Sequence, residues 1–347
     1  QTNQSRRRFM LGIGAATAAV AGCSSDDDST NDDQDDNNSD NQGDEPDSEP
    51  FDPASALPYG KWLTTAEDGL LFAYADLEAL PTTNTSDPSL EESPDDPLFV
   101  YPLVMNQIAI GLGQIQLSLA GLTRAITPDR ESESAVNEIT VLNQTVVAEG
   151  TFATDKLDQM LTEATDETWG IAYEQTGTVH GYDQYEAAEV PDSFSDDPPV
   201  IAVADDTVAV SVGPDQLERT VAAGNGDQSR IYESNETVRR LLEQAGTGDL
   251  VIGELGTPPE EVLNRGESFD TDPQFEPRSG EDVVAALEFE EGGDTVESKF
   301  ALAADDLGEN RRETVESALG SAAVDGSVSV DVSDDHLTAS GTYDTES

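Results

Sequence analysis

Two β-branched runs on either side of an aspartate pair decide the fold of this chain: Val200-Ile-Ala-Val-Ala204, then Asp205-Asp206, then Thr207-Val-Ala-Val-Ser-Val212. Valine, isoleucine and threonine favour strands, whereas aspartate favours turns. The pattern therefore predicts an antiparallel hairpin that turns at the two aspartates. The same pattern recurs near the C-terminus, where Ser327–Val332 and Leu337–Tyr343 flank Asp334-Asp335.

More strands are predicted on both sides of the first hairpin. Val283–Glu290 and Thr295–Ala303 alternate around Gly292-Gly293, which predicts a further hairpin with one face toward solvent. Other runs rich in branched and aromatic side chains are Gly69–Asp76, Glu138–Phe152, Trp169–Tyr173, Val179–Ala187 and Asp249–Leu255.

Segments with helical spacing of apolar residues lie between these strands. A helix is predicted from Thr154, because Leu157, Met160, Leu161 and Ala164 share one of its faces. Others begin at Pro214, run through Val238 to a cap at Gly246, and cover 308–319. Paired strands with helices between them predict an α+β fold with antiparallel sheets and packed helices, not a doubly wound parallel sheet.

The two halves of the chain share the order strand, helix, strand pair. Val147-Ala-Glu-Gly-Thr-Phe-Ala and Val296-Glu-Ser-Lys-Phe-Ala-Leu each lead into an amphipathic helix. Either these few identities arise by chance, or the fold contains a duplicated strand-helix-hairpin module.

A charge-free run extends from Leu98 to Thr123 and is long enough to cross a bilayer. It contains Asn106 and three glutamines (Gln107, Gln114, Gln116), whose amides would lie unpaired in hydrocarbon. We therefore expect a core helix of a soluble domain, in preference to a partner-binding helix and then to a membrane span.

The N-terminal residues have the pattern of an export signal. Arg6, Arg7 and Phe9 precede an uncharged run from Gly12 to Ala21, and Val20-Ala-Gly-Cys23 follows. From Ser24 to Pro50 the chain is almost entirely polar and acidic, which predicts a disordered spacer. The expected organisation is a signal peptide at 1–22, the anchor cysteine and acidic linker at 23–56, and an α+β domain at 57–256. A loop or boundary follows at 257–280, and a C-terminal hairpin-helix-hairpin segment at 281–347.

The chain is strongly acidic, with 73 acidic residues against 16 basic ones and a net charge of −57. Such a charge opposes the compact state unless salt screens it, and the Debye length falls to about 3 Å at 1 M salt. The profile is similar to that of proteins from extremely halophilic archaea. Binding to nucleic acid needs a clustered basic face, so no nucleic-acid partner is expected.

The N-terminal motifs and the acidity together resemble a haloarchaeal twin-arginine-exported lipoprotein. This resemblance implies that Cys23 carries a lipid and becomes the mature N-terminus, and that the domain is anchored to the cell membrane, facing outside. The single cysteine leaves none for a disulfide or a thiolate metal site. Sequons at Asn37, Asn84, Asn143 and Asn235 are possible glycosylation sites in an exported protein.

No catalytic motif is recognisable in the sequence. His180 and His336 lack metal-ligand spacing, and the sequence contains no nucleophile elbow and no phosphate-binding loop. The aromatic residues Trp169, Tyr173, Tyr182 and Tyr185 suggest either a ligand-contacting face or, with more weight, a buried strand pair. We therefore expect no cofactor and no metal.

The expected function is a non-catalytic binding or envelope interaction domain whose ligand or protein partner the sequence does not specify. One alternative is the solute-binding component of an ABC-type importer, which would have two lobes with parallel sheets. Another is a hydrolase that uses carboxylates, because pairs of acids are too abundant here to single one out.

Overall fold

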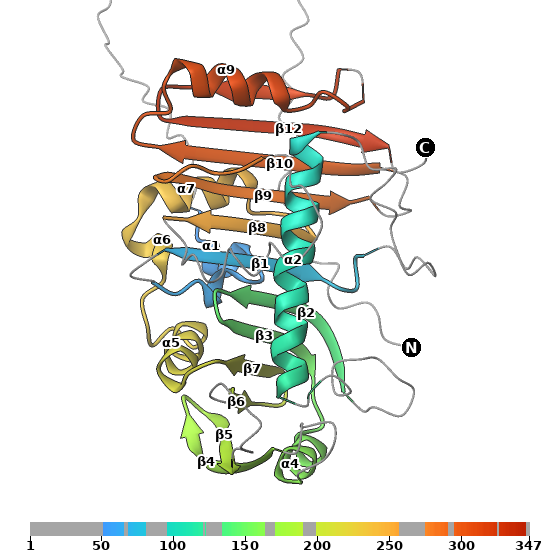
Figure 1. Ribbon diagram of the computed structural model, residues 1–347, viewed down its shortest axis with the longest axis vertical. Helices are drawn as coiled ribbons and strands as arrows, with labels where there is room; N and C mark the ends of the chain where they lie inside the picture. Colours follow the sequence, from blue (N-terminus) through green and yellow to red (C-terminus); the bar gives the residue numbers. More distant parts are fainter. Residues whose placement is uncertain are drawn as a thin grey trace, which may run out of the picture. The chain divides into compact units, whose positions relative to one another are not determined.

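The computed structural model describes residues 51–65, 69–80, 96–120, 122, 134–163, 171–189, 199–256, 275–290, 295–324 and 326–344. The described part contains seven α-helices and one 12-stranded sheet in which every pair of neighbours is antiparallel, so the α+β prediction is confirmed (Figure 1). The strand order is β11-β12-β10-β9-β8-β1-β2-β3-β7-β6-β5-β4. The strands are β1 (Leu70–Asp76), β2 (Ala135–Leu142), β3 (Thr145–Thr151), β4 (Ala172–Val179), β5 (Tyr182–Glu189), β6 (Val200–Val203), β7 (Thr207–Ser211), β8 (Leu250–Leu255), β9 (Glu281–Phe289), β10 (Thr295–Ala304), β11 (Ser329–Val332) and β12 (His336–Asp344).

Both hairpins predicted from aspartate pairs are present. In β6–β7, Val203 lies opposite Val208 and the chain turns at Asp205-Asp206. In β11–β12, Val332 lies opposite Leu337 and the chain turns at Asp334-Asp335.

Helices cover both faces of the sheet, and two apolar clusters lie on its two sides. One cluster includes residues of α2 (Pro97–Leu119), α4 (Thr154–Thr162) and α9 (Glu309–Ala318). The other includes residues of α5 (Pro214–Gly224), α6 (Ile231–Ser234), α7 (Glu236–Ala245) and the 3-10 helix η1 (Gly60–Trp62). Strand β1 alternates between them, with Leu71, Ala73 and Ala75 on the first side and Leu70, Phe72 and Tyr74 on the second.

This double coverage corrects the expectation of a wet face on β9. Residues 283–287 of that strand are all buried, and only Glu288 in its last part is exposed. The expectation rested on the alternation of Leu287 and Phe289 with Glu288 and Glu290, and these four residues lie at or just beyond the end of the strand. The rest of the strand has α7 on one side and α2 on the other, so both of its faces lie in apolar surroundings.

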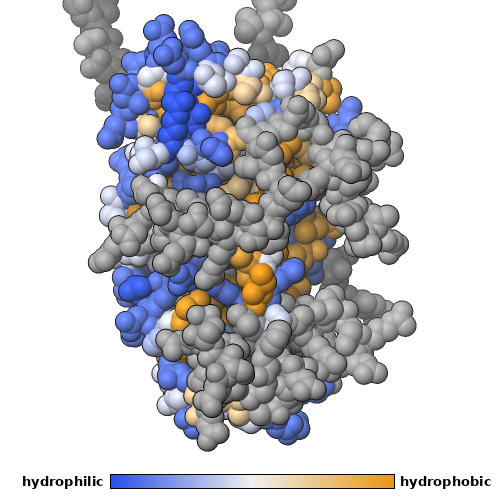
Figure 2. Space-filling view, in the orientation of Figure 1, coloured by the Kyte–Doolittle hydropathy of each residue, from blue (hydrophilic) through white to orange (hydrophobic). Residues whose placement is uncertain are grey.

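The charge-free run forms α2, which crosses the strands from β12 to β7 (Figure 1). Pro97–Ser118 is long and apolar enough for a membrane span, yet half of its best window is buried inside the protein. Asn106 is 2% exposed and donates both hydrogens of its amide, to Tyr74 O at 2.8 Å and Val251 O at 2.9 Å. The structure thus supports a core helix. Among the described residues in Figure 2, hydrophobic ones are visible in the middle of the view and hydrophilic ones toward its left.

The duplicated module is confirmed in the topology. Around the central pair β1–β8, the neighbour order β1-β2-β3-β7-β6 repeats as β8-β9-β10-β12-β11. The Asp-Asp turns occupy equivalent places: Phe152 N donates to Asp205 O at 2.9 Å, and Leu307 N donates to Asp334 O at 3.1 Å. The hairpin β4–β5 has no counterpart among the described residues of the second half.

Two of the domain boundaries expected from the sequence differ from those in the structure. The linker was expected to extend to residue 56, but α1 (Pro53–Ala56) begins after Asp52, whose carboxylate accepts a hydrogen bond from Ala54 N. Phe51 and Leu57, on either side of α1, pack with the second apolar cluster, so this segment is part of the folded domain. Residues 57–256 and 281–347 contribute neighbouring strands, β8 and β9, to one sheet within the compact unit Pro50–Ser347.

Candidate functional site

One concave site in the described part of the chain is a cavity of about 480 Å³ beside α9. It opens between α9, the start of α2 and the segment 275–278 that leads into β9. Its volume lies within the range of small-molecule sites, which is about 300–1,000 Å³. The apolar part of its lining includes Pro97, Phe275, Val315 and Leu319.

Arg311 lies in the wall of this cavity but is already neutralised. Its guanidinium binds Glu281 through two hydrogen bonds, Nε to Oε1 at 2.8 Å and an NH2 to Oε2 at 2.7 Å. The same group donates to Glu276 O at 2.9 Å and lies 4.9 Å from the ring centroid of Phe275. Both partners of the ion pair are buried, so its role is to hold α9 against the segment before β9.

Arg278 also lines the cavity, and its side chain is exposed. Its backbone N–H donates to Glu281 Oε2 at 2.8 Å, but its guanidinium forms no hydrogen bond or ion pair with the residues that the structure describes. This is unusual in a chain with 73 acidic and 16 basic residues. A guanidinium that has no partner among the described residues, in a lining of mixed polar and apolar side chains, is suited to a ligand that combines an anionic group with an apolar body.

Aromatic packing fixes the inner wall of the cavity. The Phe275 ring makes edge contacts with Tyr101 and Phe300, at centroid distances of 5.2 and 5.1 Å. The Tyr101 hydroxyl donates to Glu254 Oε1 at 2.7 Å. Burial raises the pKa of Glu254, while the hydrogen bond from Tyr101 opposes that shift. Burial is also the main reason why the pKa of Tyr101 lies well above its ordinary value.

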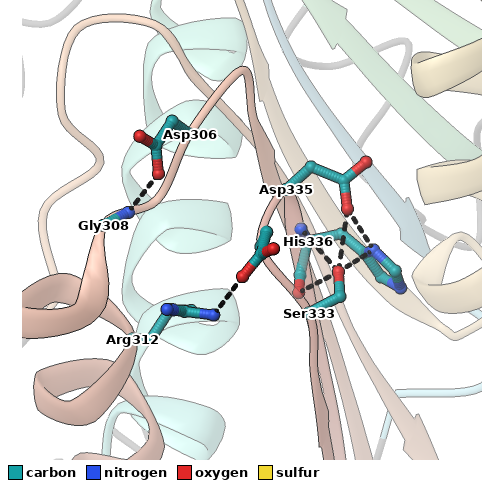
Figure 3. Close-up of polar contacts among 7 residues, drawn as sticks. Asp306, Gly308, Arg312, Ser333, Asp335 and His336 are labelled. Carbon is teal, nitrogen blue, oxygen red and sulfur yellow. Dashed lines mark hydrogen bonds and ion pairs between the residues drawn. The ribbon is translucent and has the colours of Figure 1, made fainter.

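His336 lies in a polar cluster at the β11–β12 turn (Figure 3). Its Nδ1 contacts Asp335 Oδ1 at 2.9 Å and also the Ser333 hydroxyl. Hydrogen bonds from His336 and then from Ser333 lower the pKa of Asp335 to about 2. In a hydrolytic triad the serine and the carboxylate bind different ring nitrogens, whereas here both contact the same one. The arrangement therefore does not provide a proton relay.

Neighbouring contacts show what this cluster does. Arg312 of α9 binds Asp334 at 2.6 Å, and Asp306 accepts a hydrogen bond from Gly308 N at 2.8 Å (Figure 3). These contacts fasten the β11–β12 turn to the beginning of α9. His336 is thus a polar residue at the start of β12, next to the turn. The sequence favoured such a position over a metal site.

His180 occupies a comparable place at the β4–β5 turn. It has a positive φ of 48°, and its Nδ1 lies 2.9 Å from Asp227 Oδ2. Asn225 donates to its carbonyl oxygen at 2.7 Å, which joins this turn to the end of α5. Within the described ranges, no group of three or more His, Cys, Asp or Glu side chains could hold a metal ion.

The aromatic residues of β4 and β5 do not form one ligand-contacting face. Tyr173 and Tyr185 belong to the apolar cluster on one side of the sheet, and Tyr182 belongs to the cluster on the other side. The Tyr185 hydroxyl donates to Asp158 of α4 at 3.0 Å. These three tyrosines are core residues. Trp169 lies outside the described residues.

The other residues singled out in the sequence are distributed as follows. Asn143 and Asn235 lie in described turns, whereas Arg6, Arg7, Phe9, Cys23, Asn37 and Asn84 lie outside the described residues. The cavity itself was not predicted. No local pattern of the sequence connects Arg311 with Phe275 or Arg278. No protein-family model, curated protein or solved structure matches the chain.

Proposed function

We propose that the chain is a lipid-anchored, extracytoplasmic, non-catalytic binding domain of a halophilic archaeon, with its ligand site in the cavity beside α9. The observation that carries the binding role is the guanidinium of Arg278, which has no hydrogen bond or ion pair with the described residues. It lines a cavity whose other cation, Arg311, is paired with Glu281. The N-terminal pattern from Arg6 to Cys23 supports the anchoring.

The proposed ligand is a small anion with an apolar body. The anionic group would pair with Arg278, and the apolar part would contact Phe275, Val315 and Leu319. In molar salt the overall negative charge of the protein is screened over about 3 Å, so it does not prevent such a contact at short range.

The two alternatives receive less support. An importer's binding component was expected to have two lobes with parallel strands, but the described strands form a single antiparallel sheet. A hydrolase that uses carboxylates needs a pair of acids facing its substrate. Glu276 lines the cavity, while Glu281 is occupied by the guanidinium of Arg311.

If Cys23 carries the lipid anchor, a Cys23→Ser variant should no longer be attached to the membrane. We expect wild-type protein in the membrane fraction and the variant in the soluble fraction, because the variant cannot carry the acyl chains that contribute about 0.8 kcal/mol per buried CH₂. Immunoblotting of both fractions measures this. A Ser25→Ala control should remain in the membrane fraction. If the Cys23→Ser variant stays there as well, lipid anchoring at this residue is wrong.

The ligand site predicts binding of a simple amphipathic anion. Hexanoate, detected by saturation-transfer NMR in molar potassium chloride, should bind the wild-type protein more tightly than 1-hexanol does. Arg278→Ala should weaken hexanoate binding about tenfold, which corresponds to about 1.4 kcal/mol. Arg219→Ala is the matched control, since Arg219 is an exposed arginine of α5 without an ion pair among the described residues. Equal binding by wild type and Arg278→Ala would refute this site.

A further inference from the structure

Two of the sequons named above lie in the described part of the chain, and their surroundings differ. They are Asn143-Gln144-Thr145 at the β2–β3 turn and Asn235-Glu236-Thr237 at the start of α7. N-glycosylation uses the asparagine Nδ2 as the nucleophile, and it needs the sequon at an accessible surface. The two sequons can therefore be compared by the hydrogen bonds and burial of the asparagine Nδ2 and of the threonine hydroxyl.

The Asn143 side chain is a structural part of the sheet. Its Oδ1 accepts a hydrogen bond from Leu71 N at 2.8 Å, and its Nδ2 donates to Gly69 O at 3.1 Å. The residue has a positive φ of 46°, which asparagine tolerates in tight turns. Thr145 is fully buried, and its hydroxyl lies 2.9 Å from Ser211 Oγ. Glycosylation here would break the contacts that join the β2–β3 turn to β1.

The Asn235 side chain is arranged in the opposite way. The residue is exposed, has an extended backbone with φ −123° and ψ 102°, and lies between α6 and α7. Its Oδ1 caps α7 by accepting a hydrogen bond from Val238 N at 3.1 Å. Its Nδ2 forms no hydrogen bond with the described residues. A glycan on Nδ2 would therefore leave the helix cap in place.

We infer that Asn235 is an N-glycosylation site of this protein and that Asn143 is not; the inference rests on the proposed location outside the membrane. The co-reactant is a glycan attached to a polyprenyl phosphate carrier. Nδ2 of Asn235 forms a bond to C1 of the first sugar, and the bond from C1 to the phosphate oxygen breaks. The polyprenyl phosphate leaves with the bonding electrons, and the proton from Nδ2 passes to a carboxylate of the transferase.

Peptide mass spectrometry of protein purified from its native cells tests this assignment. We expect a glycan mass on the peptide that contains Asn235 and none on the peptide that contains Asn143. A Thr237→Ala variant should lose the glycan, since it destroys the sequon but retains the capping Oδ1 of Asn235. A Thr314→Ala control, which changes an exposed helical threonine outside any sequon, should keep the glycan.

The cell fraction distinguishes the ways in which the inference can fail. An unmodified Asn235 in membrane-bound protein would overturn the glycosylation site and leave the proposed location intact. An unmodified Asn235 in cytosolic protein would overturn both. A glycan on Asn143 would overturn the selection between the two sequons. A glycan on Asn235 that persists in Thr237→Ala would show that the modification does not use the sequon.

Discussion

Transfer of the protein from molar salt to about 0.01 M salt is expected to unfold the domain, because the Debye length rises from about 3 Å to about 30 Å. The acidic side chains, which give the chain a net charge of −57, then repel one another across the whole molecule. Loss of the far-ultraviolet circular dichroism signal, with recovery when salt is restored, measures the effect. This is the largest change expected, since it removes the entire fold.

The sheet shows where part of this repulsion arises. Glu288 and Glu297 lie directly opposite each other on β9 and β10, and so do Glu174 and Glu186 on β4 and β5. Like charges in such positions destabilise a sheet. Lys299 compensates the first pair, at 2.9 Å from Glu288 and 4.0 Å from Glu297.

A neutral osmolyte provides the control for the salt experiment. Sucrose favours compact states but does not screen charge, so it should restore less structure than potassium chloride at equal osmolality. A circular dichroism spectrum that is unchanged at about 0.01 M salt would contradict the prediction that screening is what allows this chain to fold.

Asp96→Ala is expected to lower the free energy of unfolding by about 3–5 kcal/mol, because two buried and two part-buried donors lose the same acceptor at once. Asp96 Oδ1 accepts hydrogen bonds from Leu98 N and Gly320 N, both at 3.0 Å. Its Oδ2 accepts from Ala322 N and the Tyr343 hydroxyl, both at 2.9 Å. The residue is fully buried, so water cannot replace the carboxylate. This single side chain joins the start of α2 to the segment after α9 and to β12.

Urea unfolding in molar potassium chloride measures this loss; guanidinium chloride would change the ionic strength as well. Asp52→Ala is the matched control. Asp52 also caps a helix, but its carboxylate is exposed. Among the described residues it accepts hydrogen bonds from Ala54 N and Ser55 Oγ alone, so its loss should cost about 1 kcal/mol. Similar losses for the two variants would show that Asp96 acts only as a cap.

Most elements of the fold could be predicted because they depend on contacts between residues close in sequence. The Asp-Asp turns fix both hairpins, Pro214 begins α5, and Gly246 follows the last residue of α7. Two strands were expected at Trp169–Tyr173 and Val179–Ala187, whereas β4 and β5 are found at Ala172–Val179 and Tyr182–Glu189. The turn between these strands is made by His180 and Gly181, both with positive φ, which the pattern of aromatic residues did not indicate.

The candidate ligand site could not be predicted in the same way. Phe275, Arg278 and Arg311 come together only because β9 pairs with β10 and α9 packs against the segment before β9. In the sequence, Glu281 is one acid among 73. Its carboxylate is hydrogen-bonded to Arg311, whereas the guanidinium of Arg278 has no partner among the described residues.

The sequence by itself determined the hairpins, most of the helices and the antiparallel α+β class, because these follow from local propensity and apolar spacing. Its net charge also predicts a requirement for salt. Only the tertiary structure decided that the 12 described strands join in one sheet covered on both faces, and which partners surround Asp96, Arg278 and Asn235. The physical reason is that hydrogen bonds and burial of such side chains depend on partners far away in the chain. For Asp96 and Gly320, the separation is 224 residues.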